Sequence, residues 1–190
     1  MMQLELSPEP LNEKVDLLIR NQIREYTNFI MKQIMEAKNG TVFSLNLNQV
    51  EAINASGTDE IIVKPIRWMQ ENIKEHDKYL YLKNLSGVTE FDHAYNIGTV
   101  LQYDKICVMV DDPTIPYLGY LGGSRDQMKT VLDQVYLHKI VTAKDVAIYT
   151  NKHVNTTSTQ LSQLYKKRLI KREEEILPEG GRSYIYKSLF

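Results

Sequence analysis

The sequence has little cysteine and no long hydrophobic run. Cys107 is the only cysteine among 190 residues, so one chain cannot form a disulfide or a cysteine-rich metal site. It lies in the apolar run 106–110, where we expect a buried structural thiol. No stretch of about 18 apolar residues occurs, and residues 1–10 lack a basic segment followed by an apolar one. We therefore expect a cytoplasmic protein that does not enter a membrane.

Motifs of common enzyme and metal sites are missing as well. The histidines lack a metal-binding spacing such as H-E-x-x-H and are far apart, at His76, His93, His138 and His153. Gly122 and Gly123 precede a helix without the downstream lysine of a phosphate-binding loop. Asp111 and Asp112 follow an expected strand, where α/β proteins hold ligands, but Pro113 favours a turn. We predict no enzymatic activity, no cofactor and no metal.

The charge is unevenly distributed along the chain. The formal net charge is -1, yet residues 125–190 hold twelve Lys and Arg against seven Asp and Glu. Residues 1–124 hold eleven against seventeen. A basic C-terminal part suits a polyanionic partner, although part of this excess charge is expected simply to be solvated.

The clearest local pattern begins at Thr142. Thr142 and Asp145 have the spacing of a capping box, so a helix is expected to begin here. Residues 151–155 have the composition of a turn, after which Asn155 or Thr156 is expected to cap a second helix. Helical spacing places four residues on the inner side of this second helix: Leu161, Leu164, Tyr165 and Arg168.

The opposite side of the second helix is polar and basic. It carries Thr156, Thr159, Gln160, Gln163, Lys166 and Lys167. Such residues read base edges or hold phosphates when a helix lies in a major groove. The β-prone runs 169–176 and 182–186 then flank the glycine-bearing turn 178–181, which predicts a hairpin.

This order of helix, turn, helix and hairpin, preceded by an amphipathic helix, resembles the winged helix-turn-helix family. The specific part is the run STQLSQLYKKRLIKR at 158–172, which matches the family's recognition helix and first wing strand. The family often has a glycine before the leucine of that strand, where this chain has Arg168. The resemblance covers the last third of the chain and implies an α+β domain over residues 125–190 that binds double-stranded DNA. Bases would face Thr156, Thr159, Gln160 and Gln163, and phosphates would contact Lys166, Lys167, Lys171, Arg172 and Arg182.

The N-terminal part alternates helices with strands. Apolar residues at helical spacing predict a helix over 12–38, and residues 1–10 are expected to be a loose arm. Strands are expected at 41–47, 78–82 and 105–110, and helices at 57–76, which Pro65 is expected to kink or split, and at 88–102. Alternation of this kind favours an α/β domain with parallel strands.

The run LNLNQVEAINASGTDEI at 45–61 resembles the strand, loop and helix start of STAS-like domains. Two positions depart from that family: Asn54 stands at an acidic position, and Ala55 stands where a serine is phosphorylated in the anti-sigma-factor antagonists. A phosphorylation switch at Ala55 is therefore excluded. The resemblance implies a small sheet with helices within residues 1–110 and a partner-binding surface. That surface would comprise Asn54, Ser56, Thr58 and Asp59, although Ser56 also has the spacing of a plain helix cap. Residues 111–124, with two prolines and three glycines, are expected to be the linker.

Two functions remain open from the sequence. The first is a transcriptional regulator that binds double-stranded DNA through the C-terminal domain, with the N-terminal domain sensing or dimerising. The second is a non-enzymatic adaptor that binds a protein partner at the STAS-like surface. Glu173, Glu174 and Glu175 favour the adaptor, because at least one carboxylate would face the same way as the basic residues. The apolar length of residues 15–34 predicts a homodimer.

Overall fold

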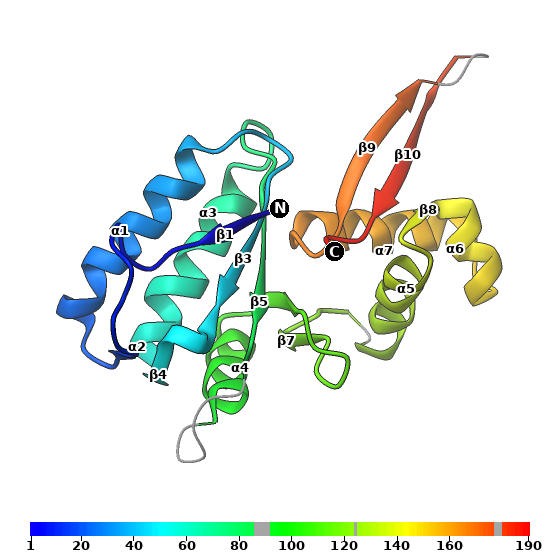
Figure 1. The fold of residues 1–190 in the computed structure, drawn as a ribbon. Helices are drawn as coiled ribbons and strands as arrows, with labels where there is room; N and C mark the ends of the chain where they lie inside the picture. Colours follow the sequence, from blue (N-terminus) through cyan, green and yellow to red (C-terminus); the bar gives the residue numbers. More distant parts are fainter. Residues whose placement is uncertain (86–91, 124, 177–179) are drawn as a thin grey trace. The chain divides into compact units, whose positions relative to one another are not determined.

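We describe the protein from a computed structural model, which defines residues 1–85, 92–123, 125–176 and 180–190. The chain forms two compact units, Met1–Tyr120 and Leu121–Phe190. Figure 1 follows both along the sequence. Together they make a mixed α/β protein whose largest sheet is mainly parallel.

The first unit is built on a five-stranded sheet in the order β1-β3-β5-β6-β7. Its strands are β1 (Met2–Leu4), β3 (Val42–Asn46), β5 (Tyr79–Lys83), β6 (Cys107–Val110) and β7 (Tyr117–Gly119). The first four run parallel, and β7 pairs antiparallel with β6. The expected strands at 41–47, 78–82 and 105–110 are thus confirmed, and β6 buries Cys107 as expected.

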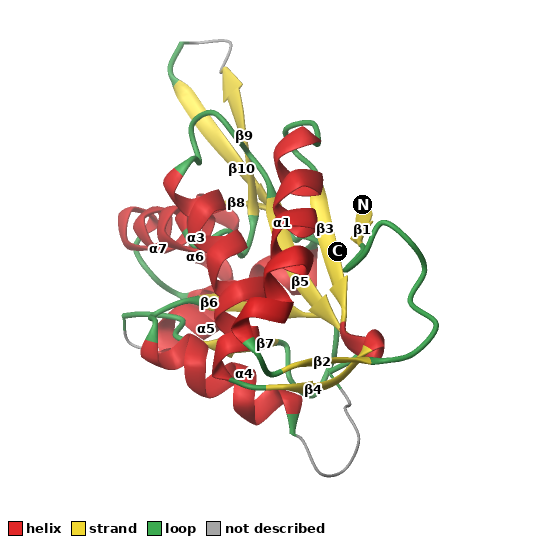
Figure 2. Ribbon diagram, turned by 90° about the vertical axis from the view of Figure 1, so that its left-hand side faces the viewer, coloured by secondary structure: helices red, strands yellow, loops and turns green. Residues whose placement is uncertain are grey.

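The helices of this unit connect successive parallel strands. They are α1 (Arg20–Glu36), α2 (Ala55–Thr58), η2 (Asp59–Val63), α3 (Lys64–Glu71) and α4 (His93–Tyr103). Because the parallel strands follow one another in chain order, right-handed crossovers place their helices on one face of the sheet. Figure 2 shows α1 and α3 in front of β3 and β5. Phe43, Leu45, Leu80 and Leu82 are buried in the resulting core with residues of α1 such as Ile30.

The predicted helix over 12–38 is wrong at its beginning. Val15–Leu17 forms β2, which pairs in parallel with β4 (Val50–Ile53). A short 3-10 helix, η1 (Leu47–Gln49), directly precedes β4. Residues 1–10 are also not simply a loose arm, because Met2–Leu4 pairs with β3 as β1. Both errors have one cause: each strand is specified by a partner about 35 to 40 residues away in the sequence, which a local pattern does not contain.

Pro65 does not split its helix. It lies in the first turn of α3, directly after η2, a π-helical turn in which the Lys64 N–H donates to the Asp59 carbonyl. Proline has no N–H to donate to the preceding turn, and the wider turn before it keeps the helix continuous. The predicted helix over 57–76 therefore exists as three joined segments ending at Glu71.

The second unit contains three helices and a small antiparallel sheet. Its elements are α5 (Arg125–His138), β8 (Ile140–Thr142), α6 (Ala143–Thr150), α7 (Val154–Lys166), β9 (Lys171–Ile176) and β10 (Arg182–Lys187), with sheet order β8-β10-β9. Met128, Val131, Leu132 and Val135 of α5 are buried. The hairpin of β9 and β10 is confirmed, while two residues of its predicted turn 178–181, Pro178 and Glu179, lie outside the described residues.

The segment predicted as a linker, 111–124, is partly ordered in the first unit. Tyr117–Gly119 is strand β7, and the two units divide after Tyr120. Gly119 allows this return, since its φ is +90° and an added Cβ would lie 2.6 Å from the Leu101 Cβ. Proline and glycine content alone did not separate the edge strand from a connection.

Candidate nucleic-acid interface

Two helices joined by a tight turn form the framework of the candidate interface. The capping box at the start of α6 is confirmed: the Thr142 N–H and hydroxyl each lie 2.8 Å from Asp145 Oδ2, and the Asp145 N–H donates to Thr142 Oγ1. Hydrogen bonds from Thr142 lower the pKa of Asp145 from its ordinary value. Asn151 ends α6 in the left-handed conformation, with φ +51°. The chain can therefore turn directly into α7.

Helix α7 begins two or three residues earlier than expected. Its first residue is Val154, after His153, so neither Asn155 nor Thr156 is its cap, and His153 makes no side-chain cap hydrogen bond. The inner side buries Thr157, Leu161 and Leu164. The outer side exposes four of the predicted DNA-binding residues, which we call the outer stripe: Thr156, Thr159, Gln163 and Lys166.

Gln160 does not belong to this stripe. The prediction required an accessible side chain, but Gln160 is 8% exposed. It is three residues from Thr157 and four from Leu164, so it lies on the inner side at the boundary of the polar face. Its Oε1 has no hydrogen-bond partner among the described residues. We therefore remove Gln160 from the residues that can face a base.

The end of α7 explains why Arg168 replaces the glycine of the family pattern. Arg168 has φ +64°, and the Leu169 N–H donates to the Leu164 carbonyl at 3.1 Å, which closes a Schellman-type turn. Glycine adopts this conformation most readily, yet the Arg168 side chain is buried and its guanidinium lies 5.0 Å from the Tyr165 ring. The expected inner position of Arg168 is confirmed. Lys167, which precedes it, is half-buried.

Arg172 connects the hairpin to α7. Its guanidinium carbon lies 4.1 Å from the centre of the Tyr165 ring and 4.4 Å from that of Tyr184. It also faces Tyr186, where burial raises the pKa of the hydroxyl and Arg172 partly opposes the rise. Each such cation–π contact is worth about 0.5 to 2 kcal/mol. Arg172 was predicted to contact phosphate, but in the structure it packs between aromatic rings and sets the position of the hairpin on α7.

Two other cations of the hairpin, Arg182 and Lys187, are paired with carboxylates of the hairpin itself. Arg182 Nε lies 3.2 Å from Glu174 Oε1, and Lys187 Nζ lies 2.6 Å from Glu173 Oε2. The Arg182 side chain is nevertheless 72% exposed, so it can exchange its partner for a phosphate. Lys171 is half-buried at the start of β9.

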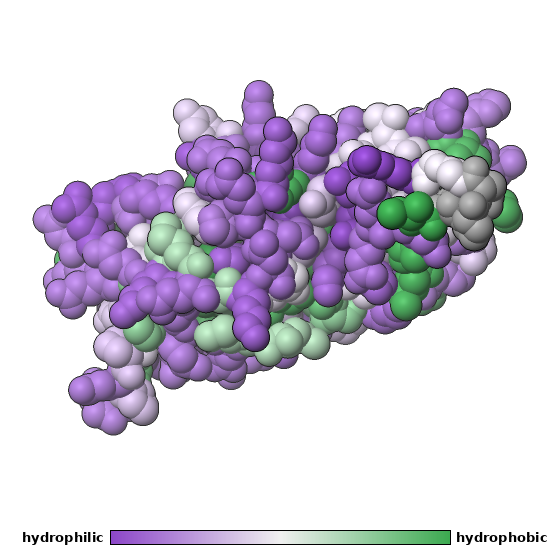
Figure 3. Space-filling model, turned by 90° about the horizontal axis from the view of Figure 1, so that it is seen from above, coloured by the Kyte–Doolittle hydropathy of each residue, from purple (hydrophilic) through white to green (hydrophobic). Residues whose placement is uncertain are grey.

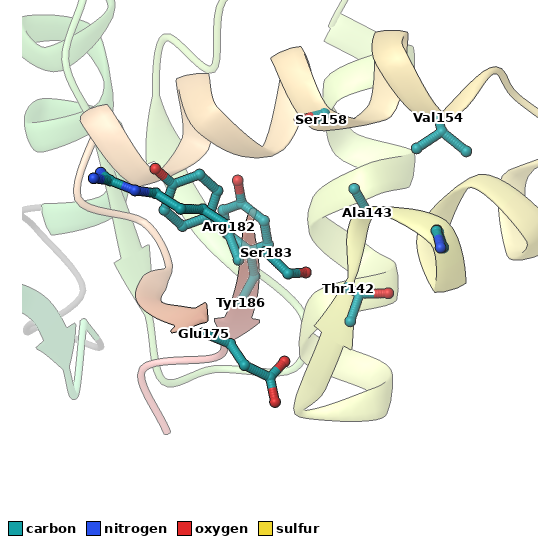
Figure 4. A pocket seen from close by; sticks show the side chains of 10 residues that line it. Thr142, Ala143, Val154, Ser158, Glu175, Arg182, Ser183 and Tyr186 are labelled. Carbon is teal, nitrogen blue, oxygen red and sulfur yellow. The ribbon is translucent and has the colours of Figure 1, made fainter. Parts of the chain in front are cut away.

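A groove of about 480 Å³ lies beside the outer stripe. Figure 4 shows Val154 and Ser158 of α7 above it, Thr142 and Ala143 at the start of α6, and the hairpin residues opposite. The groove exists because β8 ends at Thr142 and pairs only with the last three residues of β10. Two exposed cations, Lys144 and Arg182, line it.

Sequence reasoning did not select five residues of this groove: Lys144, Val154, Ser158, Ser183 and Tyr184. One signal was available for Lys144. It is a cation in the first turn of a helix, where the helix dipole disfavours positive charge. A lysine at such a position is more favourable when it contacts an anionic partner.

The predicted partner-binding residues of the first unit have mostly structural roles. Asn54, not Ser56, caps α2: its Oδ1 accepts from the Gly57 N–H at 3.1 Å, and its Nδ2 donates to the Leu18 carbonyl at 2.9 Å. Thr58 is fully buried and donates to the Asn54 carbonyl. Its predicted place on a binding surface does not agree with this burial. Only Ser56 keeps a partly accessible side chain without such a contact in the described part of the chain.

Asp59 belongs to a cluster of charges that ties α1 to η2. Arg20 Nη1 lies 2.8 Å from Asp59 Oδ2 and 2.6 Å from Glu60 Oε1, and Lys64 Nζ lies 2.5 Å from the same Glu60 oxygen. Glu60 is 2% exposed, and Thr27 Oγ1 also donates to it. Burial raises the pKa of Glu60, but Lys64, Arg20 and Thr27 outweigh burial and lower it. The charges of this cluster are used within the unit.

Asp112 and the histidines, considered above as possible ligands, have separate local contacts. Asp112 accepts from the Thr114 N–H and hydroxyl, which confirms the expected turn. His76 packs on Trp68 and His138 on Tyr149, while His93 is buried with Nε2 3.2 Å from the Glu51 carbonyl. Within the described ranges, no three His, Cys, Asp or Glu side chains gather to hold a metal. No helix in those ranges has the length and apolarity to span a membrane.

Comparison with known proteins gives little. No protein-family model matches the chain, and no curated protein matches it. One solved structure, a protein of Methanosarcina mazei Go1 named "Possible transcriptional regulator", is similar with 20% identity and a TM-score of 0.31. The similarity covers 33% of this chain and 53% of that protein, so the matched part spans about half the length of the neighbour. A likeness at this level carries no argument about this chain.

Proposed function

We propose that the chain is a non-enzymatic transcriptional regulator that binds double-stranded DNA through its second unit, as a winged helix-turn-helix domain. The observation that carries the proposal is the outer stripe of α7. Thr156, Thr159, Gln163 and Lys166 point away from a fully packed inner side and span about 15 Å along the helix. A B-DNA major groove admits a helix, and these side chains can donate to or accept from base edges.

The surroundings of the stripe support the same proposal. The groove between α7 and the hairpin carries Lys144 and Arg182, both exposed and both able to approach a phosphate. Lys166, at the end of α7, adds a third exposed cation. In this arrangement α7 reads bases in the major groove, and the DNA backbone lies between α7 and the hairpin.

The proposal is tested by fluorescence anisotropy of the full chain with a random double-stranded DNA pool at low and moderate salt. Replacing Lys144 and Lys166 with alanine should weaken binding to all sequences, because both contacts are to phosphates. The slope of log K against log salt should fall by about 0.9 for each lost contact. Lys32→Ala with Lys38→Ala, two exposed lysines of the first unit, is the charge-matched control and should change neither quantity.

Two outcomes would reject DNA binding by this surface. The first is no binding by the wild-type chain at low salt. The second is an equal effect of the Lys32 and Lys38 control and of the Lys144 and Lys166 variant, because the attraction would then come from the overall charge and not from α7.

The adaptor remains the second proposal, because one observation favours it. Glu173 and Glu174 engage Lys187 and Arg182, so the hairpin presents less free positive charge than its sequence suggests. In this alternative the surface around Ser56 binds a protein and the second unit serves assembly. A pull-down that recovers a stoichiometric partner, and loses it in Ser56→Trp, would support the adaptor.

We propose further that the chain forms a homodimer and that the first unit senses a signal or mediates the dimer contact. The apolar length of residues 15–34, on which the dimer was predicted, is largely covered within its own unit, since Ile23, Ile30 and Ile34 of α1 are buried there. Light scattering at micromolar concentration measures the mass directly. A monomeric mass would remove dimerisation from the proposal.

A further inference from the structure

The proposed function does not use the three consecutive carboxylates of β9. Glu173, Glu174 and Glu175 are all exposed. A DNA-binding hairpin would be expected to avoid carboxylates next to the backbone of a polyanion. Their presence therefore needs a separate explanation.

The three side chains do not all face the same way. Successive residues of a strand point to opposite faces, so Arg172 and Glu174 share one face and Glu173 lies on the other. The contact of Arg172 with Tyr165 identifies the first face as the one turned toward α7. Arg182, which pairs with Glu174, lies on that face as well, while Glu173 pairs with Lys187 on the opposite face.

Glu174 therefore acts on the proposed interface in two ways. It places a negative charge next to Arg182, which lines the groove proposed for the DNA backbone, and it occupies that arginine. Glu175, which shares the other face of the strand with Glu173, lines the groove as well. Neither effect depends on base sequence, so both lower the affinity for all DNA equally. The base contacts of α7 must then supply a larger share of the binding free energy, while the ratio of affinities between two sites stays the same.

We propose that Glu174 is an affinity-lowering residue of the DNA interface, which weakens sequence-independent binding by repelling phosphates and by holding Arg182. This inference rests on the proposed function, since it requires that DNA lies on α7. It extends that function by assigning the hairpin a repulsive role in addition to an attractive one.

The test compares two isosteric changes on opposite faces of the hairpin, Glu174→Gln and Glu173→Gln, in the full chain with the random DNA pool. Glu174→Gln should tighten binding about three- to tenfold at low salt, because one repulsive charge is lost and Arg182 is released. The slope of log K against log salt should also become steeper by about 0.9. Glu173→Gln should change the affinity by less than about twofold, because Glu173 faces away from α7.

A double variant separates the two effects. In Glu174→Gln with Arg182→Ala, the steeper salt slope should disappear, because no arginine is left to take a phosphate. Retention of the steeper slope would show that Arg182 is not the group released.

The outcomes distinguish this inference from the proposed function. If wild type binds DNA but Glu174→Gln leaves the affinity unchanged, or matches Glu173→Gln, the role of Glu174 is overturned and DNA binding stands. If neither wild type nor Glu174→Gln binds at low salt, DNA binding is overturned and the role of Glu174 with it. Binding by Glu174→Gln alone would support the repulsive role of Glu174 and would reject DNA binding by the wild-type chain.

Discussion

Each unit has a helix with a group of polar side chains, but these side chains are packed within the fold in the first unit and exposed in the second. At the start of α2 in the first unit, Asn54 and Asp59 contact the unit's own backbone and charges, and Thr58 is buried. On α7 of the second unit, Thr156, Thr159 and Gln163 remain exposed. Polar side chains that hold a fold together are not available to a partner, so the second unit is the better candidate for recognition.

Surface polarity alone does not distinguish the two units. The face in Figure 3 is mostly hydrophilic, as expected of solvated charges, and a polar surface alone does not identify a binding site. The distinction between the units lies in what each polar group contacts. The predictions that follow therefore change contacts within the first unit and exposed or packed groups of the second.

The largest effect is expected at Gly57. An added Cβ would lie 2.8 Å from the Leu17 Cβ and 2.9 Å from Ile53 Cγ1, so Gly57→Ala forces α2 away from β2 and β4. We expect a loss of about 3 kcal/mol from the stability of the first unit, which contains Trp68, the only tryptophan. Urea unfolding followed by Trp68 fluorescence measures it.

Gly98→Ala is the matched control for this change. Gly98 lies in helix α4, and its added Cβ would meet only Leu118 Cδ2 at 3.6 Å, an ordinary contact. Alanine should keep or slightly raise stability there. Equal destabilisation by both variants would mean that close packing at Gly57 is not the cause.

Lys78 is expected to have the next largest effect. Its buried ammonium donates to the carbonyls of Ile34 and Met35, at 2.7 and 3.0 Å, and so satisfies the end of α1. Burial lowers its pKa, yet Lys78→Met would leave two carbonyls without this donor and should cost about 2 kcal/mol. The same Trp68 transition reports the loss. A variant as stable as wild type would show that the carbonyls find other donors.

Arg172 and Lys166 should differ in how they affect DNA binding, although both are cations near α7. Arg172→Ala is expected to weaken binding about tenfold, a change of about 1.4 kcal/mol, without changing the salt slope, because Arg172 packs between tyrosines. Lys166→Ala should lower the slope by about 0.9. Arg172→Lys should not restore affinity, since lysine lacks a planar group to stack. A reduced slope in Arg172→Ala would instead make Arg172 a phosphate contact.

The capping box of α6 gives a smaller effect. Thr142→Ala removes the hydroxyl that accepts from the Asp145 N–H and should cost about 1 kcal/mol. Hydrogen exchange should become faster at the amides of α6 and remain unchanged at those of α2, which Asn54 caps. Faster exchange in both helices would show that the units do not respond separately.

The smallest effect concerns pH and Glu60. Lys64, Arg20 and Thr27 lower the pKa of Glu60 in the folded protein despite its burial. The ionised Glu60 therefore makes its full contribution to stability at pH values above its unfolded-state pKa of 4.5. That contribution is lost as the pH falls through the lower folded value. Acid titration of the Trp68 transition should show this loss, and Glu60→Gln should weaken it. An unchanged acid profile in Glu60→Gln would assign the loss to other carboxylates.

The sequence predicts best where the cause of a structure is local. The capping box of Thr142 and Asp145, the hairpin and the buried leucines of α7 depend on residues within a few positions, and all three are found. Strand β2 was predicted as helix because its pairing with β4 is set by contacts about 35 residues away. Gln160 was placed outward because it lies at the boundary of the polar face, where a small rotation of the helix decides burial.

The candidate site was predictable in its helix and not in its groove. The outer stripe follows from the period of 3.6 residues, but the groove depends on where β8 stops pairing with β10, which no local pattern contains. Arg172 and Arg182 were equivalent as basic residues of the sequence. In the structure one packs between two tyrosine rings and the other stays exposed beside a carboxylate.

The most direct test of this comparison is hydrogen exchange of the full chain with and without the random double-stranded DNA pool at low salt. We expect slower amide exchange in α7 and the hairpin, over residues 154–176 and 180–187, and no change at residues 54–64 of the first unit. Slower exchange at residues 54–64 with none in α7 would contradict it and would move recognition to the first unit.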